Sequence, residues 1–148
     1  MKPKVVAFVG RSGSGKTHLI ERVIPHLIEA GLKLATLKHT HHRAYEDKAN
    51  SDTERHRAVG AHRSLLSGPG FCAAFQQGEL PFEELLRFAG HGMDLVLVEG
   101  YKFQSVPRIE VVREQDPVLP PGEALMTVTS EQVSEVVHRL LELFQPDS

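Results

Sequence analysis

The chain has a single cysteine, no strong net charge and no long run of one charge. Its 148 residues contain only Cys72, which excludes an intramolecular disulfide and a paired-cysteine zinc or redox motif. We expect this thiol to be reduced and to lie in or near the core. The formal net charge of −2, without a Lys/Arg run, indicates no attraction to nucleic acid or to anionic lipid.

Long hydrophobic segments are also lacking. The apolar run Val5–Val9 near the start is too short for a signal peptide. Nothing approaches the ~20 apolar residues that a membrane-spanning helix needs. We therefore expect a cytoplasmic protein that contacts no membrane, and the length predicts a single domain over residues 1–148.

Short apolar runs alternate with helical patterns along the chain. Val5–Val9 and Leu95–Val98 are continuously apolar, which is typical of strands buried on both faces of a parallel sheet. Apolar residues at helical spacing follow from Leu19 to Ile28, and Pro25 predicts a kink or break in that helix near Glu21 to Ile24. The pattern predicts an α/β sandwich around a mostly parallel sheet.

The remaining elements are shorter. We expect further strands at residues 34–37, 64–66, 71–75, 109–112 and 124–128, with 109–112 nearer an edge of the sheet. A short helix is predicted over 53–59 and another over 82–88, where Pro81 opens the first turn. Thr129 and Gln132 have the spacing of a capping box and predict the start of the last helix.

A glycine-rich loop follows the first strand and precedes the first helix. Its sequence, Gly-Arg-Ser-Gly-Ser-Gly-Lys-Thr, matches the phosphate-binding P-loop in full. Glycines let the main-chain N–H groups close around phosphate, and the helix that follows directs its positive end to the same place. Lys16 is expected at the β- and γ-phosphates and Thr17 at Mg²⁺. The candidate nucleotide-binding residues here are Gly10, Ser12, Gly13, Ser14, Gly15, Lys16, Thr17 and His18.

This loop makes the predicted fold a P-loop NTPase-type three-layer sandwich. Such sites use a second carboxylate at the end of another central strand to hold magnesium or its waters. Glu99 directly follows Leu95–Val98 and is the candidate. Asp94 begins the same strand, about 17 Å away if the strand is fully extended, and we assign it a structural place near a turn.

A polar, histidine-rich segment follows the second strand, where ligands bind in open α/β sheets. His39, His41 and His42 can hold a metal ion, an anion or a partner, or can belong to a solvated loop. Further along, Asp52 can arrange magnesium or an attacking water, and Arg57 can pair with phosphate. The alternative for this stretch is a solvated helix start with Asp52 as the N-cap.

Several blocks together resemble the molybdopterin-guanine dinucleotide biosynthesis adapter proteins of the MobB type. Besides the loop, they include Lys38-His39 with His41-His42, Asp52-Thr53 with Arg57, the run from Asp94 to Lys102, and Pro107-Arg108-Ile109-Glu110-Val111. The Glu99-Gly100-Tyr101-Lys102 block together with Lys38-His39 is the most specific part. The blocks occur in the family's order over about residues 5 to 113.

The resemblance implies a GTP-binding, Mg²⁺-dependent accessory protein, often a homodimer, with weak GTP hydrolysis at most. The implied partner is the guanylyltransferase that joins GMP to molybdopterin, and molybdopterin itself is an implied ligand. The loop residues carry over as phosphate and magnesium ligands. Lys16, Asp52 and Glu99 carry over as the candidate catalytic residues. His39 and Lys102 carry over as contacts to nucleotide or pterin phosphate. His18 and Thr40 depart from the family pattern, in which a second threonine and an acid are common.

The choice of guanine rests on the resemblance alone. The Asn-Lys-x-Asp motif that reads guanine in Ras-like GTPases is absent, and the only asparagine, Asn50, does not fit it. Groups after the last strand, near Thr129, are the candidates for reading the base. Two alternatives stay open: a small-metabolite P-loop kinase whose lid carries Arg43, Arg55 and Arg57, and a nickel or zinc metallochaperone GTPase that uses the histidines.

Overall fold

The computed structural model describes residues 2–41, 47–101, 105–114 and 117–146. The chain divides into two compact units, one formed by Met1–His39 with Glu83–Ser148 and the other by Thr40–Phe82. The predicted single nucleotide-binding domain over residues 1–148 stays a prediction.

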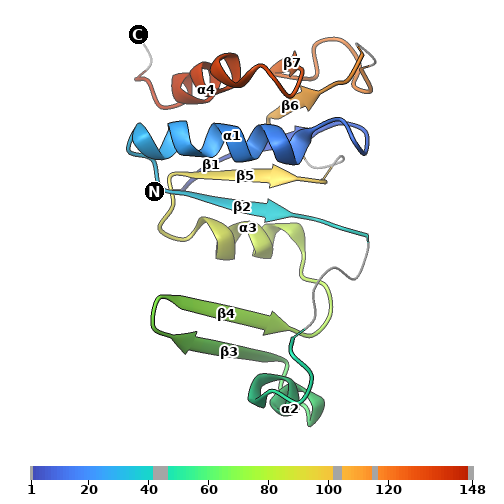
Figure 1. Ribbon diagram of the computed structural model, residues 1–148, viewed down its shortest axis with the longest axis vertical. Coiled ribbons are helices and arrows are strands. Elements are labelled where there is room, and N and C mark those ends of the chain that lie inside the picture. Colours follow the sequence, from blue (N-terminus) through green and yellow to red (C-terminus); the bar gives the residue numbers. More distant parts are fainter. Residues whose placement is uncertain (1, 42–46, 102–104, 115–116, 147–148) are drawn as a thin grey trace. The chain divides into compact units, whose positions relative to one another are not determined.

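The first unit is built on a sheet of five parallel strands in the order β2-β5-β1-β6-β7 (Figure 1). The predicted α/β fold with a mostly parallel sheet is confirmed. Parallel strands need long crossovers, and the helical patterns between the apolar runs supply several of them. The strands are β1 (Lys4–Val9), β2 (Leu34–Lys38), β5 (Leu95–Glu99), β6 (Arg108–Val111) and β7 (Met126–Val128).

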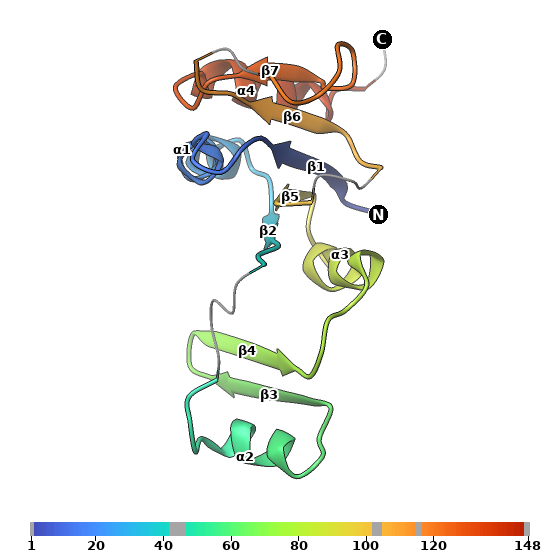
Figure 2. The same cartoon turned by 90° about the vertical axis from the view of Figure 1, so that its right-hand side faces the viewer.

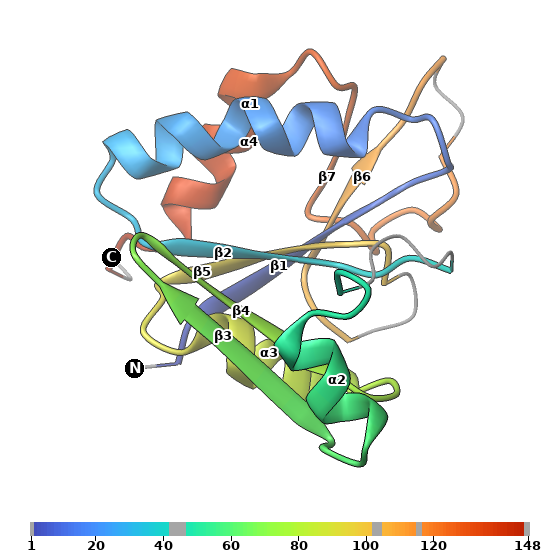
Figure 3. The ribbon, with the colours of Figure 1, turned by 60° about the horizontal axis from the view of Figure 1, so that its bottom comes forward.

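Helices cover both faces of this sheet. Helices α1 (Lys16–Glu29) and α4 (Val133–Glu142) lie on one face, and α3 (Phe82–Gly90) lies on the other (Figures 2 and 3). The main core forms between α1, α4 and the sheet, because the apolar stripes of both helices face it. Its fully buried members include Val6, Phe8, Leu19, Val23, Leu27, Leu97, Ile109, Val136 and Leu140.

Two local predictions are wrong. Helix α1 continues through Pro25, so the predicted break is wrong, whereas the predicted kink stays a prediction. Pro25 lies on the exposed side of the helix, so solvent rather than the core meets the disturbed turn. Strand β6, by contrast, lies next to the edge strand β7, which agrees with the prediction of a strand nearer an edge of the sheet. Helix α4 begins at Val133, and Thr129 contributes only half of the predicted capping box, its N–H donating to Gln132 Oε1 at 2.9 Å.

The second unit is a small hairpin with one short helix. Helix α2 (Asp52–Ala58) leads into the antiparallel pair β3 (Arg63–Gly68) and β4 (Phe71–Gln76). Cys72 is exposed on β4, which corrects the prediction of a core thiol. The reason is that helix α2 can cover only one face of this two-stranded sheet. Leu65 and Cys72 lie on the other face.

None of the helices among the residues that the structure describes has the length and apolar character needed to cross a membrane.

Candidate functional site

The glycine-rich loop connects β1 to α1 and takes backbone angles that favour glycine. Gly10, Gly13 and Gly15 have φ values of 154°, 78° and 97°. A Cβ on Gly10 would stand 2.3 Å from the carbonyl oxygen of Val111, and one on Gly15 would stand 2.7 Å from Cβ of Ser130. Both glycines therefore allow close packing that any larger residue would disturb.

The ammonium group of Lys16 and the hydroxyl of Ser14 both lie at the phosphate loop. Lys16 Nζ donates to the carbonyl oxygens of Gly10 at 2.9 Å and Arg11 at 3.0 Å, so the ammonium lies over the start of the loop. The hydroxyl of Ser14 is buried and has no hydrogen-bond partner among the described residues. An unpaired buried hydroxyl is costly in a protein that holds nothing there, and an anion in the loop would satisfy it.

A hydroxyl and a carboxylate meet beside the loop. Thr17 Oγ1 donates to Glu99 Oε1 at 2.7 Å, which joins the first turn of α1 to the end of the neighbouring strand β5. Lys38 Nζ lies 3.8 Å from the same carboxylate oxygen. The structure thus brings together two of the three predicted metal ligands. Oxygen donors of this kind are what Mg²⁺ takes in proteins, usually one or two together with phosphate and water.

The ends of β2 and β5 are joined next to this pair. The N–H of His39 donates to the carbonyl of Glu99 at 2.9 Å, and the His39 and Tyr101 rings lie 4.8 Å apart. Gly100, with φ 98°, makes the close approach possible, because a Cβ there would stand 2.6 Å from the His39 carbonyl oxygen. His39 therefore lies at the same edge of the sheet as Glu99. The predicted contact Lys102 lies outside the described residues.

The other end of β5 has a structural task, as predicted for Asp94. Its carboxylate accepts the N–H of Lys33 at 2.7 Å, and its own N–H donates to the Lys33 carbonyl at 2.7 Å. Asp94 thereby fixes the start of β2 against the start of β5. Because the strands are parallel, this is the edge of the sheet opposite the loop.

A cavity of about 240 Å³ opens between loop residues 11–14 and residues 111–113 at the end of β6. The buried carboxylate of Glu110 steadies this region, because its Oε2 accepts the N–H groups of Val118 at 2.6 Å and Leu119 at 2.9 Å. Sequence reasoning missed this task for Glu110. A charged residue inside an apolar strand pattern was the available signal.

Two predicted residues, Asp52 and Arg57, belong to the second unit. Asp52 is exposed at the start of α2, and the N-cap is Ser51, whose hydroxyl accepts the N–H of Glu54, so the alternative with Asp52 as N-cap is wrong. Arg57 donates to Asp47 Oδ2 at 2.8 Å, and its guanidinium lies 5.1 Å from the centre of the Phe75 ring. Roles for Asp52 and Arg57 at the phosphate loop stay predictions.

Asp47 is the centre of a polar cluster that the sequence analysis did not single out. Thr53 Oγ1 donates to Asp47 Oδ2 at 2.6 Å, beside the bond from Arg57. The hydrogen bond from Thr53 holds the pKa of the Asp47 carboxyl below its usual value of 3.8, and the Arg57 guanidinium acts in the same direction. To contact phosphate, the Arg57 guanidinium would have to break its hydrogen bond with Asp47 or bind both groups at once.

The predicted histidine site is only partly described. His42 lies outside the described residues, and His41 is exposed in the second unit. Within the parts of the chain that the structure covers, no group of three His, Cys, Asp or Glu side chains is placed to hold a metal ion.

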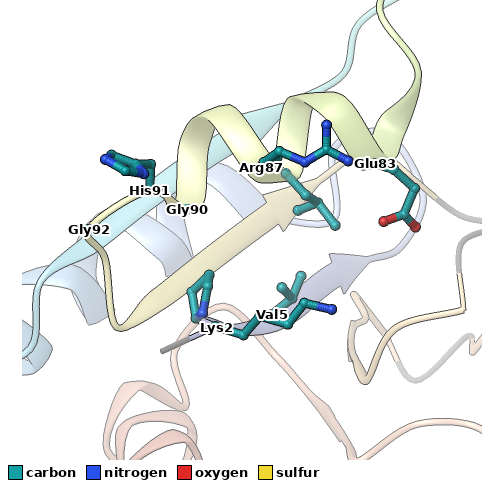
Figure 4. Close-up of a pocket in the computed structure, with 9 residues that line it drawn as sticks. Lys2, Val5, Glu83, Arg87, Gly90, His91 and Gly92 are labelled. Carbon is teal, nitrogen blue, oxygen red and sulfur yellow. The ribbon is translucent and has the colours of Figure 1, made fainter.

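A second cavity lies at the far end of β1. It measures about 620 Å³ and is formed where α3 passes the start of the strand, with Lys2, Val5, Glu83, Arg87, His91 and Gly92 among its lining residues (Figure 4). Its residues come from the start of β1 and the residues before it, from α3 and from the turn after α3, whereas the loop follows the opposite end of β1. This cavity is therefore separate from the phosphate loop.

Comparisons with a protein-family model and with known proteins lead to the same family. The family model described as molybdopterin guanine dinucleotide synthesis protein B matches residues 5–136. The chain is 31% identical over 144 residues to the molybdopterin-guanine dinucleotide biosynthesis adapter protein of Haemophilus influenzae, covering 94% of this chain and 81% of that protein. It is 33% identical over 117 residues to the adapter protein of Escherichia coli K12, covering 74% of this chain and 66% of that protein.

Solved structures show the same fold. The crystal structure of Bacillus subtilis MobB has a TM-score of 0.73 at 21% identity, covering 97% of this chain and 99% of that one. A MobB homologue from Bacillus stearothermophilus has a TM-score of 0.66 at 23% identity, covering 94% and 96%. At these identities the structures support the fold alone.

Proposed function

Because this chain belongs to the molybdopterin guanine dinucleotide synthesis protein B (MobB) family, we propose that it is a GTP-binding adapter that assists a guanylyltransferase in forming molybdopterin guanine dinucleotide. The observation that carries the nucleotide part is the contact of Thr17 with Glu99 at 2.7 Å beside a complete phosphate loop. A loop that only turned the chain would not need a carboxylate from another strand at its hydroxyl.

The loop residues have distinct tasks in this proposal. Main-chain N–H groups of residues 10–17 would surround the β-phosphate. Lys16, which donates to the loop carbonyls of Gly10 and Arg11, would bind the β- and γ-phosphate oxygens instead. Thr17 would give its hydroxyl oxygen to Mg²⁺, and Glu99 would hold the ion or one of its waters. The magnesium ion neutralises phosphate charge when it is bound. We expect GTP hydrolysis to be weak at most, far slower than the roughly 10 per second of ordinary enzymes.

Calorimetric titration with GTP and with ATP, each with MgCl₂, tests the nucleotide part. We expect GTP to bind more tightly than ATP, and Lys16→Ala to abolish binding of both. Lys33→Ala is the matched control, since Lys33 is exposed at the start of β2, at the opposite edge of the sheet. Equal affinity for both bases would refute the guanine preference, and unchanged binding by Lys16→Ala would refute the loop.

The adapter part has its own measurement. The guanylyltransferase is assayed with molybdopterin, GTP and Mg²⁺, with and without this chain. We expect the wild-type chain to raise the yield of dinucleotide, and Lys16→Ala to remove most of that increase. No increase from the wild-type chain, at concentrations that saturate it with GTP, would contradict the adapter function.

The second unit supports a homodimer. Val59, Leu65, Leu66 and Phe71 expose between 46% and 88% of their area, and no further strand of the described residues pairs with either outer edge of its two-stranded sheet. Exposed apolar residues beside open edges are commonly covered by a second chain. Sedimentation velocity at micromolar concentration should show twice the monomer mass of 16.4 kDa. A monomer throughout would count against the dimer.

A further inference from the structure

The contacts at the phosphate loop leave open which side of the loop receives the base. The order β2-β5-β1-β6-β7 places β5 on one side of the loop strand β1 and the pair β6, β7 on the other (Figure 1). Thr17 and Glu99 mark the β5 side as the position of magnesium and the terminal phosphates. The ribose and base therefore leave the loop on the side of β6 and β7.

On that side, the phosphate loop contacts the end of β6 and the turn between β7 and α4. Ser130 packs directly against the phosphate loop, since a Cβ on Gly15 would stand only 2.7 Å from Cβ of Ser130. The turn around Ser130 is fixed at both ends. The Thr129 N–H donates to Gln132 Oε1 at 2.9 Å, and the Gln132 N–H donates to the Thr129 carbonyl at 3.2 Å. Residues 129–132 therefore form a hydrogen-bonded turn that packs next to Gly15.

Glu131 supplies the acidic group of this turn. Arg22 donates to Glu131 Oε2 at 2.9 Å, and His18 Nε2 lies 3.8 Å from Oε1. Both partners come from the first two turns of α1, and His18 directly follows Thr17. The carboxylate is thus held beside the loop, on the side away from Glu99. Its side chain is 71% exposed, which leaves it accessible to a ligand.

We propose that Glu131 reads guanine at this site, an inference that rests on the proposed nucleotide binding. Guanine presents two donors side by side, N1–H and the 2-amino group, and a carboxylate accepts both. Adenine presents a lone pair at N1 and has no 2-amino group, so the same carboxylate repels it. Arg22 holds Glu131 in place without blocking it, because each carboxylate oxygen has two acceptor positions. Glu131 is a specificity-determining residue, and Arg22 a positioning residue.

The test is the affinity of wild type and Glu131→Gln for GTP, ITP, XTP and ATP, each with Mg²⁺, by calorimetry. Wild type should bind GTP more tightly than ITP, which lacks the 2-amino group. A bidentate contact of this kind corresponds to about a tenfold to hundredfold preference. Glu131→Gln should lose most of the preference for GTP over ATP and should bind XTP more tightly than wild type does. The glutamine amide can donate to the 2-oxo group of xanthine while its oxygen accepts N1–H.

Glu135→Gln is the matched control, since Glu135 is exposed on the first turn of α4 and should leave all four affinities unchanged. Equal weakening of all four nucleotides by Glu131→Gln would show that Glu131 only shapes the loop and would overturn the inference. Tight GTP binding that Glu131→Gln leaves unchanged would overturn it as well, while the proposed function stands. A wild-type chain that binds no nucleotide would overturn the proposed function and this inference with it.

Discussion

The two units of the chain are stabilised in different ways. The first holds its sheet between helices, and most side chains of β1 and β5 are fully buried. The second has a seven-residue helix over two strands, and few of its residues are buried. Its order depends on polar contacts instead, chiefly those that join Asp47, Thr53 and Arg57. Burial therefore positions the phosphate loop, whereas hydrogen bonds and one ion pair position the segment that carries Asp52.

The largest difference should come from matched leucine truncations. Leu97 in β5 is 1% exposed and Leu65 in β3 is 66% exposed. Leu97→Ala removes buried methyl groups and leaves a cavity, which should lower the free energy of unfolding by about 2–5 kcal/mol. Leu65→Ala should change it by less than about 0.5 kcal/mol. Urea unfolding followed by circular dichroism measures both, and similar losses would mean that the second unit has a buried core of its own.

The next largest difference in stability between the two units should come from a pair of glycine-to-alanine substitutions. Gly10 and Gly60 both have positive φ values, 154° and 122°. An alanine at either position is strained, at a cost of about 1–3 kcal/mol. At Gly10 the new Cβ also meets the Val111 carbonyl oxygen at 2.3 Å, whereas nothing lies within 4 Å at Gly60. Gly10→Ala should therefore cost about 1–3 kcal/mol more than Gly60→Ala by thermal unfolding. Equal costs would contradict the close packing of the loop on β6.

A smaller effect is expected from the helix cap of the second unit. The Ser51 hydroxyl accepts the Glu54 N–H at 3.2 Å. Ser51→Ala should destabilise α2 by about 1 kcal/mol, because one N–H of the first turn loses its partner. Hydrogen exchange should show faster exchange for the amides of α2 and unchanged exchange in α1. Ser67→Ala, at an exposed position of β3, is the control. Unaltered protection of α2 would mean that the cap contributes nothing.

The smallest effect should appear only in acid. The folded pKa of Asp47 is lowered, so its ionised form stabilises the fold at pH values above the usual 3.8. That stabilisation is lost as the pH falls below 3.8 through the folded pKa. Urea unfolding between pH 6 and pH 3 should therefore show a loss of stability that is smaller in Asp47→Asn. The same pH dependence in wild type and mutant would show that Asp47 does not contribute.

The parts of the fold that the sequence predicted well are those with a strong local signal. Continuously apolar runs located β1 and β5, and the glycine spacing located the loop between β1 and α1. The meeting of Thr17 with Glu99 followed from one rule, that parallel strands end at the same edge of a sheet. The structure places His39 at this edge too, next to Glu99.

The misses have a common cause, which is that they depend on partners distant in sequence. The exposure of Cys72 depends on which face of the β3–β4 hairpin is covered by other residues of the chain. The contacts of Asp47 with Thr53 and Arg57, and of Glu131 with Arg22, are side-chain meetings that no periodicity reveals.

A crystal structure with a non-hydrolysable GTP analogue and Mg²⁺ tests the account most directly. We predict that the triphosphate lies against the main-chain N–H groups of residues 10–17, with the Lys16 ammonium on its oxygens. The Thr17 hydroxyl should have left Glu99 for the magnesium ion. A triphosphate bound elsewhere, or a Lys16 ammonium that still rests on the carbonyls of Gly10 and Arg11 with the nucleotide present, would contradict it.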